Sequence, residues 1–303
     1  MTLHSKRIST FAIMKIARPF KSLLFAACVM FYACERNITI DLPQGAPQLV
    51  VEGYIEAGRG PIVQLSKSSG FFDVLDSNAT LSLAVKGAAV TVSDGITTVN
   101  LTEAVPGQGY LYIDATNTMI GMPGKVYTLT VTAEGQTLTA VTKITEPVGL
   151  DSLWFKVDGT RDSLGFVWAK LTDPDTIGNS YRWFAQRLGK DESFVPAPNS
   201  VFEDVFINGK SFDFAYDRGP TANDSLANSE PVEEARFFKV GDTIVVKFCT
   251  IDQDHFRFWR SYINQNQSNG NPFAAPAPIN HNVVGGLGIW GGYTPFIDTV
   301  IAR

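Results

Sequence analysis

Three cysteines carry the most reactive side chains of this 303-residue chain, and the surroundings of Cys34 are those of a modification site. Cys34 follows an uninterrupted apolar run of 11 residues, Leu23 to Ala33. A bilayer takes about 20 helical residues, whereas a run this short suits the apolar core of a signal peptide. Basic residues and no acidic ones come before it: Lys6, Arg7, Lys15, Arg18 and Lys21. We therefore expect residues 1–33 to be a signal peptide that starts at Met1 or Met14, a choice the sequence leaves open.

The chemistry expected at Cys34 is acylation. Ala33 is small enough for a signal peptidase to cut after it, and the pattern is typical of a bacterial lipoprotein precursor whose new N-terminal thiol carries a diacylglycerol or other acyl lipid such as palmitate. Phe31 and Tyr32 depart from the leucine and the small residue usual at these positions. The alternative is an ordinary secretory signal with a coincidental cysteine.

The other cysteines point away from disulfide or thiol chemistry. Cys28 leaves with the signal, so Cys249 has no internal partner for a disulfide. It lies in the strand-like run DTIVVKFCTID, residues 242–252. A catalytic thiol needs a basic neighbour and exposure, and we expect a buried, inert thiol instead.

Two clusters contain residues that bind metals in other proteins. Asp173, Asp175 and Gly178 resemble part of a calcium loop, but Ile177 stands at a ligand position and no closing Glu follows, so an Asx turn explains the loop better. His255 lies near Asp252 and Asp254, as in a metal or acid–base cluster. It falls beside the aromatic face of a predicted helix, which favours a core or interface histidine. We expect no metal.

The run from Gly286 to Gly291 spells G-x-G-x-x-G, yet a dinucleotide site needs that loop to open a helix, with an acidic residue about 20 positions on. Only 12 residues follow, with β-branched residues and a proline. We expect the glycines to mark a close strand crossing or a bulge. A functional alternative is that Trp290 and Tyr293 form an exposed aromatic surface for a partner.

Charge and motifs narrow the function classes. Without its signal the chain has 20 basic and 30 acidic residues, because five basic ones leave, so the net charge changes from −5 to about −10. Nucleic-acid binding needs clustered Lys and Arg and is not expected. Nucleophile-elbow, zinc-protease and P-loop motifs do not occur. We expect no enzyme; a hydrolase using two carboxylates is the least favoured alternative.

The secondary-structure elements predicted to position these residues are mostly β-strands. Residues 34–147 contain some seven short strands, with hairpin turns at Asp94-Gly95 and Glu134-Gly135, and predict an immunoglobulin-like β-sandwich. Tyr127, just after a Pro-Gly turn, is placed for a tyrosine-corner hydrogen bond. Residues 148–303 predict a C-terminal antiparallel β domain with one helix near 252–267, capped by Asp252 or Asp254.

Several stretches together resemble a Bacteroidota lipoprotein family known as domain of unknown function 4249. They are, besides Cys34, residues 40–72, 88–95, 124–131, 146–153 and 271–293. The resemblance implies an exported, mostly β, outer-membrane lipoprotein without known catalytic residues. It further implies a transport-accessory role, since such genes often lie beside those of TonB-dependent receptors.

From these patterns we expect a protein tied to the outer membrane only through the lipid on Cys34, on either its periplasmic or its outer face. Its favoured function is a binding or accessory partner of a TonB-dependent transporter. The alternative is a surface scaffold or interaction lipoprotein without a small-molecule ligand. The sequence names neither the ligand nor the receptor.

Overall fold

A computed structural model of the chain describes residues 46–70, 82–219, 234, 236–268 and 278–303. The predicted signal peptide, residues 1–33, and the predicted anchor Cys34 lie outside the described residues. The polar, turn-rich run from Asp217 to Ser229 predicts a long loop, and most of it lies outside the described residues as well.

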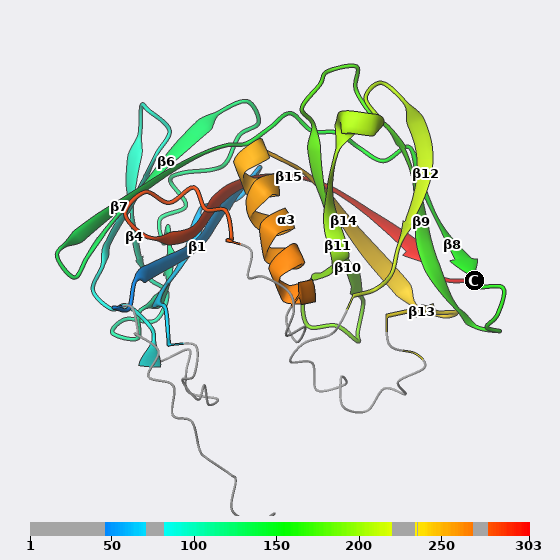
Figure 1. Ribbon diagram of the computed structural model, residues 1–303, viewed down its shortest axis with the longest axis horizontal. Helices are drawn as coiled ribbons and strands as arrows, with labels where there is room; N and C mark the ends of the chain where they lie inside the picture. The colour runs from blue at the N-terminus through cyan, green and yellow to red at the C-terminus, as the bar shows by residue number, and fades with distance from the viewer. Residues whose placement is uncertain (1–45, 71–81, 220–233, 235, 269–277) are drawn as a thin grey trace, which may run out of the picture. The chain divides into compact units, whose positions relative to one another are not determined.

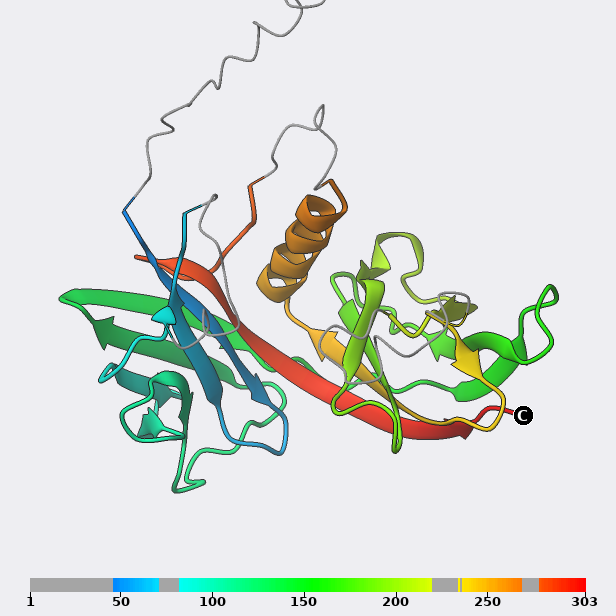
Figure 2. The same cartoon turned by 90° about the horizontal axis from the view of Figure 1, so that it is seen from below.

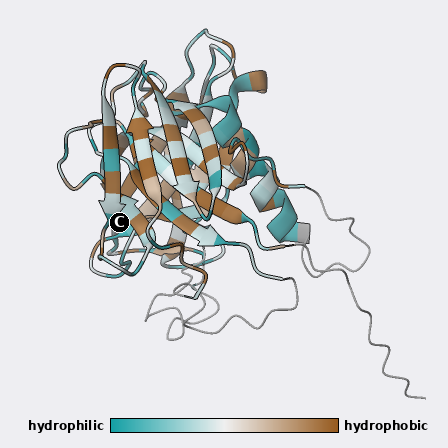
Figure 3. Cartoon of the chain, turned by 90° about the vertical axis from the view of Figure 1, so that its left-hand side faces the viewer, coloured by the Kyte–Doolittle hydropathy of each residue, from teal (hydrophilic) through white to brown (hydrophobic). Residues whose placement is uncertain are grey.

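The described residues before Pro147 form strands wherever apolar and polar residues alternate. In β6, Tyr127, Leu129 and Val131 are buried and the threonines between them are not, because successive side chains of a strand point to opposite faces. Figure 3 shows this banding along the strands. The strands are β1 (Leu49–Glu56), β2 (Ile62–Lys67), β3 (Ala89–Ser93), β4 (Thr98–Glu103), β5 (Tyr110–Ile113), β6 (Val126–Ala133) and β7 (Gln136–Lys143).

Both predicted hairpin turns are confirmed. Between β3 and β4, the Asp94 carboxylate accepts hydrogen bonds from the backbone N–H groups of Ile96 and Thr97, while Gly95 has φ of 87°. Those bonds, together with the Lys125 ammonium, lower the pKa of Asp94 to about 2. Between β6 and β7, Glu134 and Gly135 both have positive φ, as a tight hairpin turn of this kind requires.

The tyrosine corner is confirmed too. The Tyr127 hydroxyl accepts a hydrogen bond from Met122 N–H at 2.8 Å and donates to the Ile120 carbonyl at 3.4 Å. It thereby fixes the bend that leads into β6.

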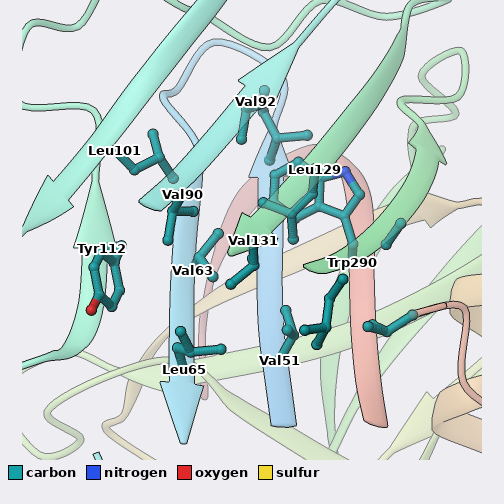
Figure 4. Packing of buried hydrophobic residues seen from close by; sticks show 14 of the residues in the cluster. Val51, Val63, Leu65, Val90, Val92, Leu101, Tyr112, Leu129, Val131 and Trp290 are labelled. Atoms are coloured by element: carbon teal, nitrogen blue, oxygen red, sulfur yellow. The ribbon is translucent and has the colours of Figure 1, made fainter. Parts of the chain in front are cut away.

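A core of aliphatic side chains lies behind these strands. Val51, Val63, Val90 and Leu129 are among its buried members, and Trp290 from the far end of the chain packs with them (Figure 4). Since such burial is worth about 25 cal/mol for each Å² of apolar surface, this cluster is a main stabiliser of the first half.

Beyond Pro147 the strands are longer and richer in aromatic residues. They are β8 (Ser152–Val157), β9 (Leu164–Thr172), β10 (Ser180–Arg187), β11 (Val195–Glu203), β12 (Ser211–Tyr216), β13 (Phe238–Lys239), β14 (Thr243–Ile251) and β15 (Leu287–Ile301). One 3₁₀ turn, η1 (Asp204–Phe206), follows β11. The predicted helix is confirmed as α3 (Gln253–Ser268), which packs on β10, β11 and β15 (Figure 1).

The strands form two sheets. A large sheet has the order β11-β10-β14-β15-β1-β2-β5-β4-β3-β6-β7, and a small one joins β12, β9 and β13, with β8 also paired to β9. Aromatic rings fill the space between the sheets: Trp183 of β10 and Phe248 of β14 contact Phe214 of β12. The predicted class, a mostly β, sandwich-like fold, is confirmed, and α3 is the one α-helix whose bounds lie within the described residues.

Strand β15 links the two halves of the large sheet. Its first residues pair in parallel with β1, from Val50 with Leu287 to Glu56 with Tyr293, and its later residues pair antiparallel with β14 (Figure 2). Residues 46–303 form one compact unit. The predicted boundary at 147/148 falls between β7 and β8, and the division into two domains there stays a prediction.

Glycines let β15 run this close to its neighbours, as predicted for the G-x-G-x-x-G run. A Cβ on Gly288 would lie 1.8 Å from the Val51 carbonyl oxygen, and one on Gly292 would lie 2.7 Å from the Lys143 carbonyl oxygen. The glycines therefore serve strand packing, and the run opens a strand instead of a helix. No described helix is long and apolar enough to cross a bilayer.

We predict that Gly288→Ala lowers the free energy of unfolding by about 3 kcal/mol or more, because the added Cβ meets backbone at a φ of 108°. The matched control is Gly241→Ala, at a φ of 98° with no atom within 4 Å, which should cost only about 1 kcal/mol. Urea unfolding of both variants measures the difference. Equal losses would show that the close β1–β15 approach is not the constraint.

Candidate functional site

A pocket of about 570 Å³ lies where the large sheet meets α3. Its volume falls in the range that small-molecule sites occupy. Strands β1, β10, β14 and β15 contribute most of the lining, and α3 closes one side. The lining includes Glu52, Tyr54, Glu56, Arg59, Arg182, Phe184, Lys247, His255, Trp259, Tyr262, Ile289 and Tyr293.

Period-two alternation brings these side chains to one face of the sheet. Glu52, Tyr54 and Glu56 are alternate residues of β1, and β15 offers Ile289 and Tyr293 in register beside them. On β10 and β14, Arg182 and Phe184 lie opposite Cys249 and Lys247. The pocket floor is therefore a continuous patch of four neighbouring strands.

Arg182 is the most unusual residue of the site. Its side chain is 5% exposed, and in the part of the chain that the structure describes no carboxylate lies within ion-pair distance of it. Nη1 donates a hydrogen bond to the Tyr293 hydroxyl, while the guanidinium carbon lies 3.4 Å from the centre of the Trp259 ring. Burial lowers the pKa of Arg182, but a guanidinium does not lose its proton in a protein. The site thus holds a desolvated positive charge stacked on an indole.

Two hydrogen-bond donors remain unused beside this charge. Arg182 Nε and Trp259 Nε1 are buried, and neither has a hydrogen-bond partner among the described residues. Buried donors are nearly always paired in folded proteins, and leaving one unpaired costs about 1–3 kcal/mol. A bound group that accepts hydrogen bonds from both donors would remove this cost.

The other charged groups of the pocket form ion pairs or lie at its rim. Glu56, 3% exposed, forms ion pairs with Lys247 Nζ and, at 3.4 Å, with Arg59 Nε. Glu52 is exposed at the rim. Lys247 Nζ also lies 5.6 Å from the centre of the Tyr293 ring. Arg182 is left as the charge without a local counter-ion.

Aromatic rings form the walls. The ring centroid of Tyr293 lies 5.8 Å from that of Tyr54 and 5.9 Å from that of Phe184, both in edge-to-face geometry. Burial raises the pKa of Tyr293, so its hydroxyl stays protonated while it accepts the bond from Arg182. Such walls suit a ligand with a flat or apolar body.

His255 anchors the helix over the pocket. Its ring lies against Gly291, where a Cβ would come within 2.3 Å of it, and 4.5 Å from the Tyr293 ring centroid. It is 1% exposed, as expected of a core histidine. Burial, and next the Arg182 charge, lower its pKa to about 3. The neutral ring donates from Nδ1 to the Gly292 carbonyl at 3.3 Å, because a carbonyl can only accept.

Of the two predicted capping residues, Asp252 and Asp254, Asp252 caps the helix. Its Oδ1 accepts a hydrogen bond from His255 N–H at 2.8 Å. Its Oδ2 accepts from the Thr142 hydroxyl and from Lys143 N–H, at the end of β7. Asp252 therefore holds the start of α3 against a strand instead of forming an acid–base cluster with His255.

The predicted aromatic surface of Trp290 and Tyr293 needs correction. Trp290 is fully buried, and its indole N–H donates to the Tyr127 carbonyl at 3.0 Å. Tyr293 is 6% exposed and lies in the pocket. Three residues apart on a strand, the two side chains point to opposite faces. The prediction of a shared exposed surface is therefore wrong, while binding at Tyr293 stays a prediction.

Two further residues singled out in the sequence, Cys249 and Asp173, are buried within the fold. Cys249 is a free, buried thiol as expected, and burial raises its pKa to about 12. Asp173 accepts hydrogen bonds from the Tyr181 hydroxyl and from Gly209 N–H. The described residues contain no group of three or more His, Cys, Asp and Glu side chains that could hold a metal ion. Cys34, the predicted lipid attachment point, lies outside the described residues.

Sequence reasoning missed Arg182 and Lys247. Both stand in runs that read as buried strands, YRWFAQRL and TIVVKFCTI. A basic residue in the middle of an apolar strand is itself a signal, because Lys and Arg are almost never fully buried unless paired. Their meeting with α3 depends on strand order, which local pattern does not give.

Comparisons with known proteins give a family and little else. The sequence model of the family described as "Domain of unknown function (DUF4249)" matches residues 35–296. No curated protein matches the chain. A crystal structure of a mutant Salmonella alpha-2-macroglobulin aligns with 89% of this chain and 16% of its own, at 10% identity and a TM-score of 0.22, which carries no argument.

We predict that acid weakens the fold through His255. The pKa of His255 is about 3 in the folded chain and about 6.5 when unfolded, so between these values only the unfolded state takes up the proton. The contribution of His255 to the free energy of unfolding is fully present well above pH 6.5 and falls as the pH drops towards 3. From pH 7 to 5 the loss is roughly 2 kcal/mol.

Urea unfolding at pH 7, 6 and 5 measures this loss. His255→Asn keeps a donor for the Gly292 carbonyl and should remove most of the loss, whereas His281→Asn, at an exposed histidine, should keep the native profile. An unchanged pH dependence in His255→Asn would contradict the assignment.

Proposed function

The chain belongs to the DUF4249 family, and on this premise we propose that it is a lipid-anchored outer-membrane protein of Bacteroidota type that binds a small ligand as the accessory partner of a TonB-dependent transporter. The pocket beneath α3 is the observation that carries the proposal. It combines aromatic walls with a few converging polar groups, the usual composition of a ligand site.

The energetics of the pocket support a binding role. The Arg182 guanidinium is 5% exposed and has no carboxylate partner among the described residues. Its buried charge, its unused Nε donor and the unused indole donor of Trp259 each destabilise the folded chain. An apolar residue in place of Arg182 would avoid that cost. Groups that weaken a fold in this way concentrate at functional sites, where a ligand supplies the missing partner.

The lipid anchor gives the pocket its place in the cell. Each buried CH₂ contributes about 0.8 kcal/mol, one acyl chain alone binds reversibly, and two or three chains hold firmly. Cys34 stands 15 residues before Leu49, the first residue of β1, so the tether spans at most about 50 Å. A protein so tethered stays within reach of a barrel receptor in the same membrane.

The alternatives have less support. A scaffold without a ligand does not account for the unused donors around Arg182. The hydrolase alternative needs two carboxylates about 5–9.5 Å apart. Glu52 and Glu56, the carboxylates of the pocket, are four residues apart on one strand, about 13 Å along it, and Glu56 is already paired.

We predict that Cys34→Ser moves the protein from the membrane fraction to the soluble fraction, because the acyl chains are its only proposed tie to lipid. Fractionation with immunoblotting of the native and variant chains measures this. Cys249→Ser, at the buried thiol, is the matched control and should remain with the membrane if it folds. A Cys34→Ser chain that remained membrane-bound would overturn the anchor.

We further predict that the native protein, extracted in mild detergent and captured through a C-terminal tag, brings down a β-barrel receptor of the TonB-dependent class. Mass spectrometry identifies the captured proteins. The Cys34→Ser chain, expressed at the same level, should capture less receptor because it is no longer held at the membrane. Repeated capture of the native chain without any such receptor would contradict the partnership.

A further inference from the structure

We propose that the ligand of this pocket is a small monocarboxylate with a flat, apolar body, whose carboxylate binds Arg182 and Trp259. The inference rests on the proposed ligand-binding function and specifies the ligand's chemistry. It is carried by the stacked, unpartnered donors Arg182 Nε and Trp259 Nε1 at the pocket wall.

The donors select a carboxylate. A guanidinium presents its N–H groups in a planar fork that matches a carboxylate, and such charge-assisted bonds are stronger than neutral ones. In Arg182 one arm of the fork, Nη1, is held by the Tyr293 hydroxyl, which fixes its orientation. The indole of Trp259 can donate a hydrogen bond but has no atom that accepts one. Together they favour an acceptor-only, negatively charged group.

The charge balance selects a monoanion. The lining holds three cations, Arg59, Arg182 and Lys247, and two carboxylates, Glu52 and Glu56. The lining therefore carries one net positive charge. Glu56 forms ion pairs with Lys247 and Arg59, whereas Arg182 has no carboxylate partner among the described residues. A phosphate dianion would bring a second negative charge into a pocket whose rim already carries Glu52.

The walls select the body of the ligand. Rings from β1, β10, β15 and α3 surround the space next to the guanidinium: Tyr54, Phe184, Tyr293, Trp259 and Tyr262. Aromatic faces accept flat apolar groups in stacked or edge-to-face contact. The two donor nitrogens are covered by neighbouring side chains, so the ligand oxygen reaches them once one of these moves. Tyr262 on α3, 40% exposed, is the most exposed of the five lining rings.

Calorimetry on the folded full chain tests the proposal with pairs of probes that differ only in charge: indole-3-acetate against indole-3-acetamide, benzoate against benzamide, and hexanoate against hexanamide. We expect at least one aromatic carboxylate to bind, and its amide to bind roughly ten- to a hundredfold more weakly. Arg182→Met should abolish that preference. Because it removes an unpaired buried charge, it should not lower the melting temperature.

Arg257→Met is the matched control, since Arg257 lies on α3 two residues before Trp259 but is exposed and paired with Asp254. It should bind like the native chain. If Arg182→Met does not fold, Trp259→Phe serves instead. It keeps an aromatic ring, lacks the N–H, and should bind the carboxylate roughly two- to tenfold more weakly.

Equal binding of carboxylates and amides, no binding of any probe, or full preference in Arg182→Met would each overturn the proposed ligand class. Receptor capture is a separate measurement. If the native chain captures a receptor but prefers no carboxylate, the ligand class fails and the accessory role stands. If carboxylates bind without receptor capture, the ligand class stands and the partnership fails.

Discussion

The pairing of β15 with both β1 and β14 is the constraint on which the rest of this structure depends. Two runs of strands, one before Pro147 and one after it, share a single sheet only because β15 hydrogen-bonds to each. The glycines at 288, 291 and 292 make this possible, because a side chain at any of them would meet backbone or the His255 ring. The pocket floor follows directly, since it is made of the strands that meet at this junction.

A buried arginine gives that junction its chemical character. Arg182 is placed by β10, held by the Tyr293 hydroxyl from β15 and covered by Trp259 from α3. Three elements thus converge on one charge. Burial, and next this charge, lower the pKa of His255 and keep its ring neutral, which lets the helix pack its histidine against the sheet. The position of α3 and the electrostatics of the pocket therefore depend on the same residues.

Local patterns predicted much of the fold and little of the site. Alternation in β6, the Asp94-Gly95 and Glu134-Gly135 turns, the Tyr127 corner and α3 with its Asp252 cap all followed from residues close together in sequence. Arg182 and Lys247 escaped because their importance comes from strand order, which joins distant segments. Trp290 was misplaced because strand parity, which puts it opposite Tyr293, was not applied to β15.

Parallel pairing between β1 and β15 also sets an order of events for a chain made from its N-terminus. β1 emerges early, yet the edge that pairs Val50 to Glu56 with β15 stays open until Leu287 to Tyr293 have been synthesised. An open edge of alternating apolar residues is prone to wrong pairing. A chain interrupted before β15 would therefore keep an unfilled gap in the middle of its large sheet, a defect that proteases and chaperones are suited to recognise. The large sheet can therefore close only after the last strand, β15, has been synthesised.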